Sequence, residues 1–260
     1  MGADTRKFVR GAKLPGKRAA CRRMDDEVRR RARREPSRFC SLIMPSRTLH
    51  DFDLLSSAGV PLGNCRTIER DRSTFEEIRE EIRMAVGDRC EDIMGAMSME
   101  LGRRVAEFRE PFDWMNLDLC GPIQRVLERC VDHLARWCFR EGSCLEVTVK
   151  CARENKDDAR LIDMLAELAE STKIEPDRGR PLAVRRRELA LFTLLVMHPL
   201  DHGWLPSGYL TASYREDRSD GSRGLPMLCS MATGYRSVGG HADKAIWSII
   251  HELWDNRDNG

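Results

Sequence analysis

The chain has 260 residues, of which 33% are charged and 41% are hydrophobic, and its mean hydropathy is −0.50. No stretch reaches the roughly 20 consecutive apolar residues of a membrane-spanning helix, which excludes an integral helical membrane protein. The N-terminal segment has no apolar core followed by small residues, so we expect no secretory signal. Ten cysteines in such a chain are expected to be reduced thiols, which predicts a reducing, intracellular (cytoplasmic) setting.

The formal net charge of +2 is the sum of two unlike parts. Residues 1–35 contain thirteen Lys or Arg and five Asp or Glu, whereas the remainder is mildly acidic. Arg clusters, Gly and Pro with few apolar residues predict a largely flexible arm over residues 1–37, with a helix near 25–34. Such an arm is suited to nucleic acid, to an acidic protein partner or to a membrane surface, and a solubilising tail or an Arg-rich targeting peptide is the alternative interpretation.

From residue 38 onward, short apolar runs alternate with segments long enough for a helix, which is typical of consecutive βαβ units. The residues 93–99 fit a third strand, although their methionines also keep helical spacing. The other expected strands cover 39–44, 65–69, 114–120 and 145–150, and the helices between and after them cover 51–58, 74–86, 123–138 and 157–168.

The last third of the chain has a different pattern. A half-buried helix is expected over 182–197, and an amphipathic helix over 242–254. Between them, β runs over 209–214 and 226–233 flank a polar turn, which predicts an antiparallel hairpin. Residues 38–260 are therefore predicted to form one α/β domain, a three-layer Rossmann-like sandwich whose mostly parallel sheet has a C-terminal antiparallel hairpin.

Two carboxylates are candidates for chemistry, because ligands of open α/β sheets bind outside the carboxyl ends of the strands. Glu69 ends the second strand, where a carboxylate can accept both hydrogen bonds of a ribose diol; the alternative is a surface ion pair with Arg70 or Arg72. Asp118 lies inside an apolar strand, where burial of a carboxylate is costly unless the group is used or paired. A structural cap on the following turn is the alternative for Asp118.

The strand order, the acidic end of the second strand and the final hairpin together resemble the class I S-adenosylmethionine-dependent methyltransferases, over roughly residues 38–236. The segment NLDLCGP, residues 116–122, is similar to the substrate-side motif of that superfamily. The resemblance implies S-adenosylmethionine as the cofactor, with Glu69 holding its ribose. It also implies a pocket near the methyl group that is lined by Asn116, Asp118 and Leu119, with Asn116 and Asp118 in catalytic roles.

The first loop departs from the pattern of that superfamily, whose loop is usually rich in glycine so that the backbone can approach the cofactor closely. Residues 44–51 contain no glycine. One interpretation is a loop of another shape, in which Pro45 and Ser46, together with Asp51 or Asp53, contact the cofactor. The other is a catalytically inactive methyltransferase-fold module that binds nucleic acid or a protein through its basic arm.

Other classes of site have weaker support. Cys120 lies where cytosine-C5 methyltransferases carry their nucleophile, but Leu119 precedes it instead of proline, and a buried apolar cysteine is the default interpretation. The sequence has no CxxC pair, P-loop, GxSxG or HExxH motif, and we expect no metal site. The GxGxxG motif of nicotinamide-dependent Rossmann enzymes is also absent, so we expect no nicotinamide cofactor. The leading hypothesis is methyl transfer from S-adenosylmethionine, with nucleic acid as a candidate acceptor.

Overall fold

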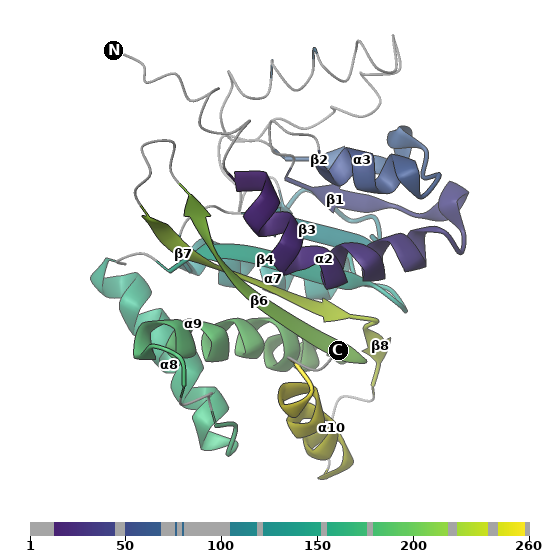
Figure 1. Cartoon of the computed structure of the whole chain (residues 1–260). Helices are drawn as coiled ribbons and strands as arrows, with labels where there is room; N and C mark the ends of the chain where they lie inside the picture. The colour runs from purple at the N-terminus through teal and green to yellow at the C-terminus, as the bar shows by residue number, and fades with distance from the viewer. Residues whose placement is uncertain are drawn as a thin grey trace.

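The computed structural model describes residues 13–44, 50–68, 76, 80, 105–118, 122–151, 155–175, 179–217, 223–238 and 244–257 of the chain. Its centre is a six-stranded sheet with the order β2-β1-β3-β4-β7-β6 (Figure 1). β1 pairs in parallel with β2 and β3, and β3 pairs in parallel with β4. β7 is antiparallel to both β4 and β6, so within this sheet β7 runs against the other five strands.

The elements follow one another as alternating strands and helices before the final hairpin. The strands of the main sheet are β1 (Ser41–Ile43), β2 (Cys65–Thr67), β3 (Trp114–Asp118), β4 (Cys144–Lys150), β6 (Gly208–Asp217) and β7 (Arg223–Thr233). A small second sheet pairs β5 (Trp204–Leu205) with β8 (Arg236–Ser237). The helices are α2 (Lys13–Ala32), α3 (His50–Ser57), α7 (Arg125–Trp137), α8 (Lys156–Ser171), α9 (Leu182–Phe192) and α10 (Lys244–Asp255), with short 3-10 helices at Pro36–Arg38, Leu62–Asn64 and His198–His202 and a π-helix at Thr193–Met197.

The predicted α/β fold class is confirmed by this sheet. The strands expected near 39–44, 65–69, 114–120 and 145–150 are β1 to β4, and the expected hairpin is β6 and β7. The helix expected over 182–197 is α9 continued by the π-helix. The helix expected over 74–86 and the strand expected over 93–99 lie outside the described residues, apart from the isolated positions 76 and 80.

Two apolar clusters cover the two faces of the sheet. On one face, Met115, Leu117 and Val147 pack against α7, α8, α9 and α10. On the other face, Ile43, Trp114 and the neighbouring strands pack against α2 and α3 (Figure 1). None of the helices in the described ranges is both long and apolar enough to cross a bilayer.

The N-terminal segment differs from the predicted flexible arm. Residues 13–32 form α2, and its side chains Cys21, Met24, Val28 and Ala32 are buried against the sheet. These four positions recur at the three- and four-residue spacing of one helix face, so their burial stabilises the helix despite its many arginines. The sequence prediction placed a helix only near 25–34, because four small or medium apolar residues are a weak signal among so many charges. Residues 1–12 lie outside the described part.

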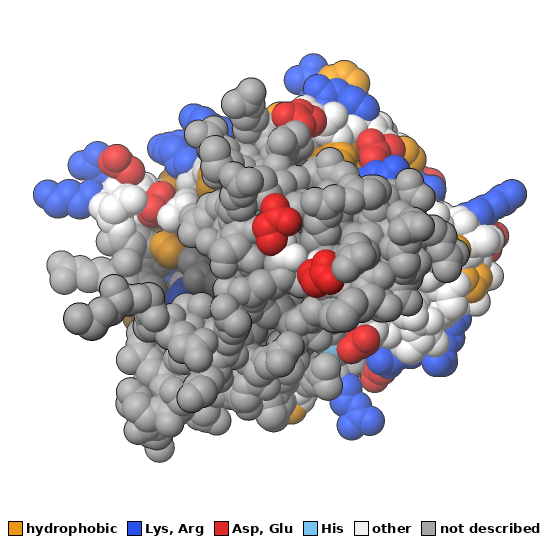
Figure 2. Space-filling view, turned by 90° about the horizontal axis from the view of Figure 1, so that it is seen from above, with side chains coloured by type: hydrophobic (Ala, Val, Ile, Leu, Met, Phe, Trp, Pro, Cys, Tyr) orange, Lys and Arg blue, Asp and Glu red, His pale blue; other side chains and the backbone are white. Residues whose placement is uncertain are grey.

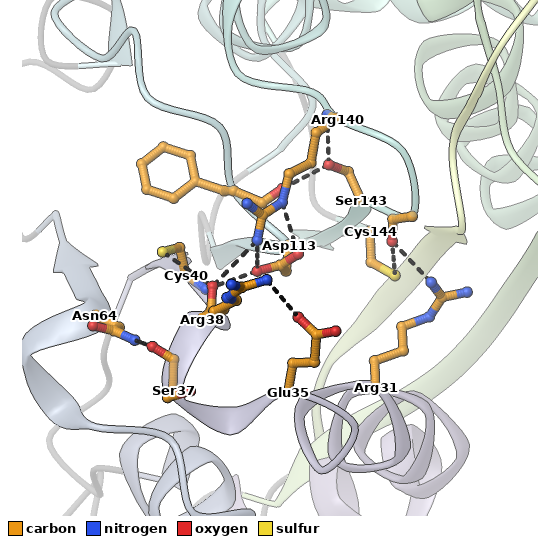
Figure 3. A network of polar contacts seen from close by, with 12 residues as sticks. Arg31, Glu35, Ser37, Arg38, Cys40, Asn64, Asp113, Arg140, Ser143 and Cys144 are labelled. Atoms are coloured by element: carbon orange, nitrogen blue, oxygen red, sulfur yellow. Dashed lines mark hydrogen bonds and ion pairs between the residues drawn. The ribbon is translucent and has the colours of Figure 1, made fainter.

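The ends of α2 and of the central strands are joined by polar contacts where the parallel strands begin, which we term the amino edge of the sheet (Figure 3). The Asp113 carboxylate accepts hydrogen bonds from the Cys40 backbone N–H (2.8 Å) and from Arg140 Nε (2.8 Å), and Arg140 Nη2 forms a second contact with it. Arg31 of α2 donates from Nη1 to the carbonyl of Gly142 (2.8 Å). These contacts connect α2, β1, β3 and the start of β4.

We expect Met24→Ala to lower the free energy of unfolding by about 2 to 4 kcal/mol, because Met24 is 1% exposed and its loss leaves a cavity between α2 and the sheet. Arg22→Ala, on the exposed side of the same helix, is expected to change it by less than about 0.5 kcal/mol. Chemical denaturation of both full-length variants measures the difference. Equal stability of the Met24 variant and the wild type would mean that α2 is not part of the cooperative fold.

Candidate functional site

A ligand-binding crevice is expected at the point in the sheet where the chain connections lead to opposite sides, which is beside β1. From β1 the chain passes through α3 to β2 on one side, whereas β3 lies on the other side of β1. In open α/β sheets ligands bind outside the carboxyl ends of the strands at such a switch point. The residues of interest are therefore those at the carboxyl ends of β1 and β3 and in the first turn of α3.

Two buried polar side chains meet at this place. Asn116 of β3 is 1% exposed, and its Nδ2 donates a hydrogen bond to Asp51 Oδ2 (3.3 Å). Asp51 belongs to the first turn of α3 and is also buried. A carboxylate is favoured in the first turn of a helix, because the helix dipole is positive there. The pair thus joins β3 to the beginning of α3 directly above the switch point.

The Asn116 amide keeps an unused hydrogen-bonding group. Its Oδ1 is buried and has no hydrogen-bond partner in the part of the chain that the structure describes. A buried carbonyl oxygen without a partner costs roughly 1 to 3 kcal/mol. Polar atoms are rarely left in this state without a reason, and a bound ligand that donates a hydrogen bond is one such reason.

The other predicted site residues fall into two groups. Asp118 is the last residue of β3 and is half-buried, so it lies at the carboxyl end of the strand and is less enclosed than the sequence suggested. Asp53 is on the exposed side of α3, in a groove that also includes Asp25 and Arg29 of α2. The remaining candidates, Pro45, Ser46, Glu69, Leu119 and Cys120, lie outside the described residues.

The sequence analysis did not single out Glu146, a buried carboxylate next to this pair. Glu146 is 3% exposed and lies directly opposite Asn116 in the β3–β4 register. Its oxygens accept hydrogen bonds from the Trp114 indole Nε1 (3.3 Å) and from the Cys229 thiol (3.3 Å). The sequence does place Glu146 on the same face of its strand as Thr148 and Lys150, because side chains two residues apart point to the same side. The burial of Glu146 could not be read from this alternation, because the prediction of a flexible arm left α2 out of the layer that covers that face.

The residues of the described ranges do not form a metal site with three or more His, Cys, Asp or Glu ligands. The two histidines of the 3-10 helix after the π-helix instead converge on one carboxylate of α7. His202 Nε2 lies 2.7 Å and His198 Nε2 lies 3.6 Å from Asp132 Oδ1. This arrangement ties the 3-10 helix to α7, away from the switch point.

Comparison with known proteins finds similarity only among solved structures. No protein-family model matches the chain, and no curated protein matches it. A SAM-dependent methyltransferase from Agrobacterium tumefaciens is 11% identical, with a TM-score of 0.42, over 82% of this chain and 62% of that one. The O-methyltransferase TomG from Streptomyces achromogenes, in complex with SAM, is 15% identical, with a TM-score of 0.39, over 84% and 80%. M. jannaschii TYW2 in complex with AdoMet is 9% identical, with a TM-score of 0.41, over 82% and 76%.

The first two of these proteins are named as methyltransferases, and the third was solved with AdoMet bound. All three TM-scores are below 0.5, so the activities and ligands in these names are statements about those proteins alone. The fold of this chain is assigned from its own sheet, in which β7 lies between β4 and β6 and is antiparallel to both.

The described cysteines are mostly buried thiols. Burial raises the pKa of Cys65 and of Cys144 to about 11, and the pKa of Cys130 and of Cys138 to about 12. The thiolate is the reactive form, so these four groups have little nucleophilic character near neutral pH. The half-buried Cys40 also has a raised pKa through burial, but reagents can reach it more easily.

We expect native protein at pH 8 to react with iodoacetamide at Cys40 at least tenfold faster than at Cys130 or Cys144. Burial raises the pKa of Cys130 and of Cys144, so their thiolates are scarce below about pH 11 and their labelling should increase only as the pH approaches that value. Mass-spectrometric mapping of the labelled peptides over time measures the rates. Rapid labelling of Cys144 in folded protein would contradict the packing of β4.

Proposed function

We propose that the chain is an S-adenosylmethionine-dependent methyltransferase whose cofactor binds in a crevice outside the carboxyl ends of β1 and β3. The observation that supports this most directly is the buried pair Asp51 and Asn116 at the switch point, with the Asn116 Oδ1 unused. A carboxylate and a carbonyl oxygen are hydrogen-bond acceptors, and the first also carries a negative charge. The crevice therefore suits a ligand that is cationic and rich in donors.

S-adenosylmethionine has this chemistry. It carries a positive sulfonium and an ammonium group, and when bound it supplies an activated methyl group to a nucleophile. Asp51 would hold the ammonium or the positive end of the cofactor, and Asn116 would accept a hydrogen bond. By the resemblance to the superfamily, Pro45, Ser46, Asp53, Glu69 and Leu119 remain candidates for further cofactor contacts, with Glu69 on the ribose.

Little acid or base help is needed for such a transfer, so positioning supplies most of the rate. Asp118 stands at the carboxyl end of β3, two residues after Asn116 and on the same face of the sheet. In our proposal Asp118 orients the acceptor or takes up its proton. Asn116 and Asp51 fix the end of β3 against α3, so that the acceptor and the cofactor meet in one place.

Calorimetric titration of the full-length protein with S-adenosylmethionine tests the proposal. We expect Asp51→Asn to weaken the binding at least tenfold, because it removes the charge but retains an acceptor for the Asn116 amide. Asn116→Ala is expected to weaken it to a similar degree. Ser56→Ala, on the exposed side of α3, is the matched control and should bind like the wild type.

The possible outcomes separate the interpretations. If the wild type binds neither S-adenosylmethionine nor its demethylated product, the proposed function is wrong. A larger effect of Asp53→Asn than of Asp51→Asn would move the cofactor contact to the exposed side of α3. Thermal unfolding of each variant shows whether a loss of binding reflects a loss of fold.

We further propose nucleic acid as the methyl acceptor, held in part by residues 1–35. Within this segment α2 contains eight Lys or Arg and three Asp or Glu. Arg29 and Arg30 are engaged by Asp26 and Glu27, respectively. Three further arginines of this segment are exposed and form no ion pair among the described residues: Arg22, Arg33 and Arg34. Lys and Arg project at several places around the rim of the molecule, interspersed with Asp and Glu (Figure 2), so particular residues must be tested.

We expect the triple replacement of Arg22, Arg33 and Arg34 by Ala to weaken binding of single-stranded RNA or DNA about tenfold or more. It should also lower the slope of log K against log salt by about two to three, because up to three phosphate contacts are lost. Fluorescence anisotropy at several salt concentrations measures both. The matched control is Arg160→Ala with Arg125→Ala on α8 and α7, since these exposed arginines already lie beside acidic residues. An equal loss in this control would assign the effect to net charge alone.

A further inference from the structure

Trp137 is exposed to an unusual degree for a large aromatic side chain. It ends α7 at the amino edge of the sheet and is 48% exposed, whereas Trp114 and Trp254 are buried. The other large apolar side chains that are exposed in the described ranges are not aromatic: they are Met164 and Leu168 of α8 and Leu182 at the start of α9. An indole ring that packing does not need is a candidate for contact with a ligand or a partner.

Two guanidinium groups lie against this ring. The Cζ atoms of Arg109 and Arg136 are each 5.2 Å from the centre of the Trp137 ring, within the range of a cation–π interaction. Arg109 is held in place by its Nη1, which donates to the carbonyls of Ala106 (2.6 Å) and Phe108 (2.7 Å). The same Nη1 lies 2.9 Å from His133 Nε2, one turn before Trp137 on α7. The ring and its cations therefore form a preordered surface.

The charges of this surface are not compensated. Neither Arg109 nor Arg136 forms an ion pair with a carboxylate in the described part of the chain, unlike Arg66 and Arg140 nearby, which pair with Glu110 and Asp113. An exposed aromatic ring with free cations beside it suits a ligand that has both flat π-faces and negative charges. Nucleic-acid bases and phosphates have these two properties, and bases stack on both indole rings and arginine planes.

We infer that Trp137, Arg109 and Arg136 form a stacking platform for an unpaired base of single-stranded nucleic acid, separate from the proposed crevice outside the carboxyl ends of β1 and β3. The base stacks on the indole or on a guanidinium plane, and the arginines neutralise the flanking phosphates. A protein partner is less suited to this surface, because the ring is surrounded by charged and polar side chains, and the other exposed apolar side chains lie on different helices. The platform requires nucleic acid as a partner but does not require methyl transfer.

The test uses the full-length chain and short labelled single-stranded RNA and DNA oligonucleotides, with a duplex of the same sequence. Trp137→Ala is expected to weaken single-strand binding about tenfold, whereas Trp137→Phe, which keeps an aromatic face, should retain most of the affinity. Arg136→Ala should lower the salt slope by about one. Met164→Ala removes a side chain of equal exposure on α8 and should bind like the wild type. Duplex binding should change less than single-strand binding.

Three results would overturn the platform. The first is unchanged single-strand affinity in Trp137→Ala, and the second is an equal loss in Met164→Ala. The third is self-association of the wild type that Trp137→Ala abolishes, seen by light scattering, with no effect on nucleic-acid binding. Titration with S-adenosylmethionine is run in parallel, because Trp137→Ala should leave cofactor affinity unchanged. A failure of the platform is thus distinguishable from a failure of the proposed methyltransferase function.

Discussion

The position of the candidate site depends on Asp113, at the opposite edge of the sheet. Its carboxylate accepts the backbone N–H at the start of β1 and the guanidinium of Arg140 that precedes β4, while Asp113 itself precedes β3. Three strands are thereby held at their starting points. Because side chains alternate along a strand, a slip of one residue would turn Asn116 to the other face of the sheet. The fixed register is what places Asn116 opposite Glu146 and next to Asp51.

α2 turns the second face of the sheet into an interior. Because α2 covers the part of this face that carries β4, β6 and β7, Glu146 is shielded from water. Beneath α2, Glu146 must find partners in Trp114 and Cys229, and Cys229 in turn contacts the Met24 sulfur at 3.4 Å. The close fit extends to the amino edge, where a Cβ on Gly234 would lie 2.7 Å from Arg31 and where the φ of 63° favours glycine. α2 is therefore a structural layer, and its outer side is the part of this helix that a partner can reach.

The regular elements could be predicted from the sequence, because burial imposes a period that the residues display. In β4, Leu145, Val147 and Val149 alternate with polar residues, and α7 carries a continuous apolar stripe. The sequence did not allow us to predict which of the polar residues are buried in the folded protein. Asp51 and Asp53 are separated by roughly 200° around α3, and only the packed helix shows that Asp51 faces the sheet and Asp53 the exterior. The burial of Glu146 could not be predicted for a related reason, because it depends on α2, which lies more than a hundred residues earlier in the chain.

Two of the surfaces proposed for ligands, the crevice and the Trp137 platform, lie at opposite ends of α7. This helix leaves the carboxyl end of β3 near the crevice and reaches the amino edge at Trp137, so its 13 residues span about 20 Å. A nucleic acid that stacks on Trp137 and presents an acceptor to the crevice must therefore extend along the molecule over at least that distance. A free nucleoside cannot occupy both places. If both proposals hold, an oligonucleotide long enough to reach both surfaces should bind more tightly than a mononucleotide, which can occupy only one of them at a time.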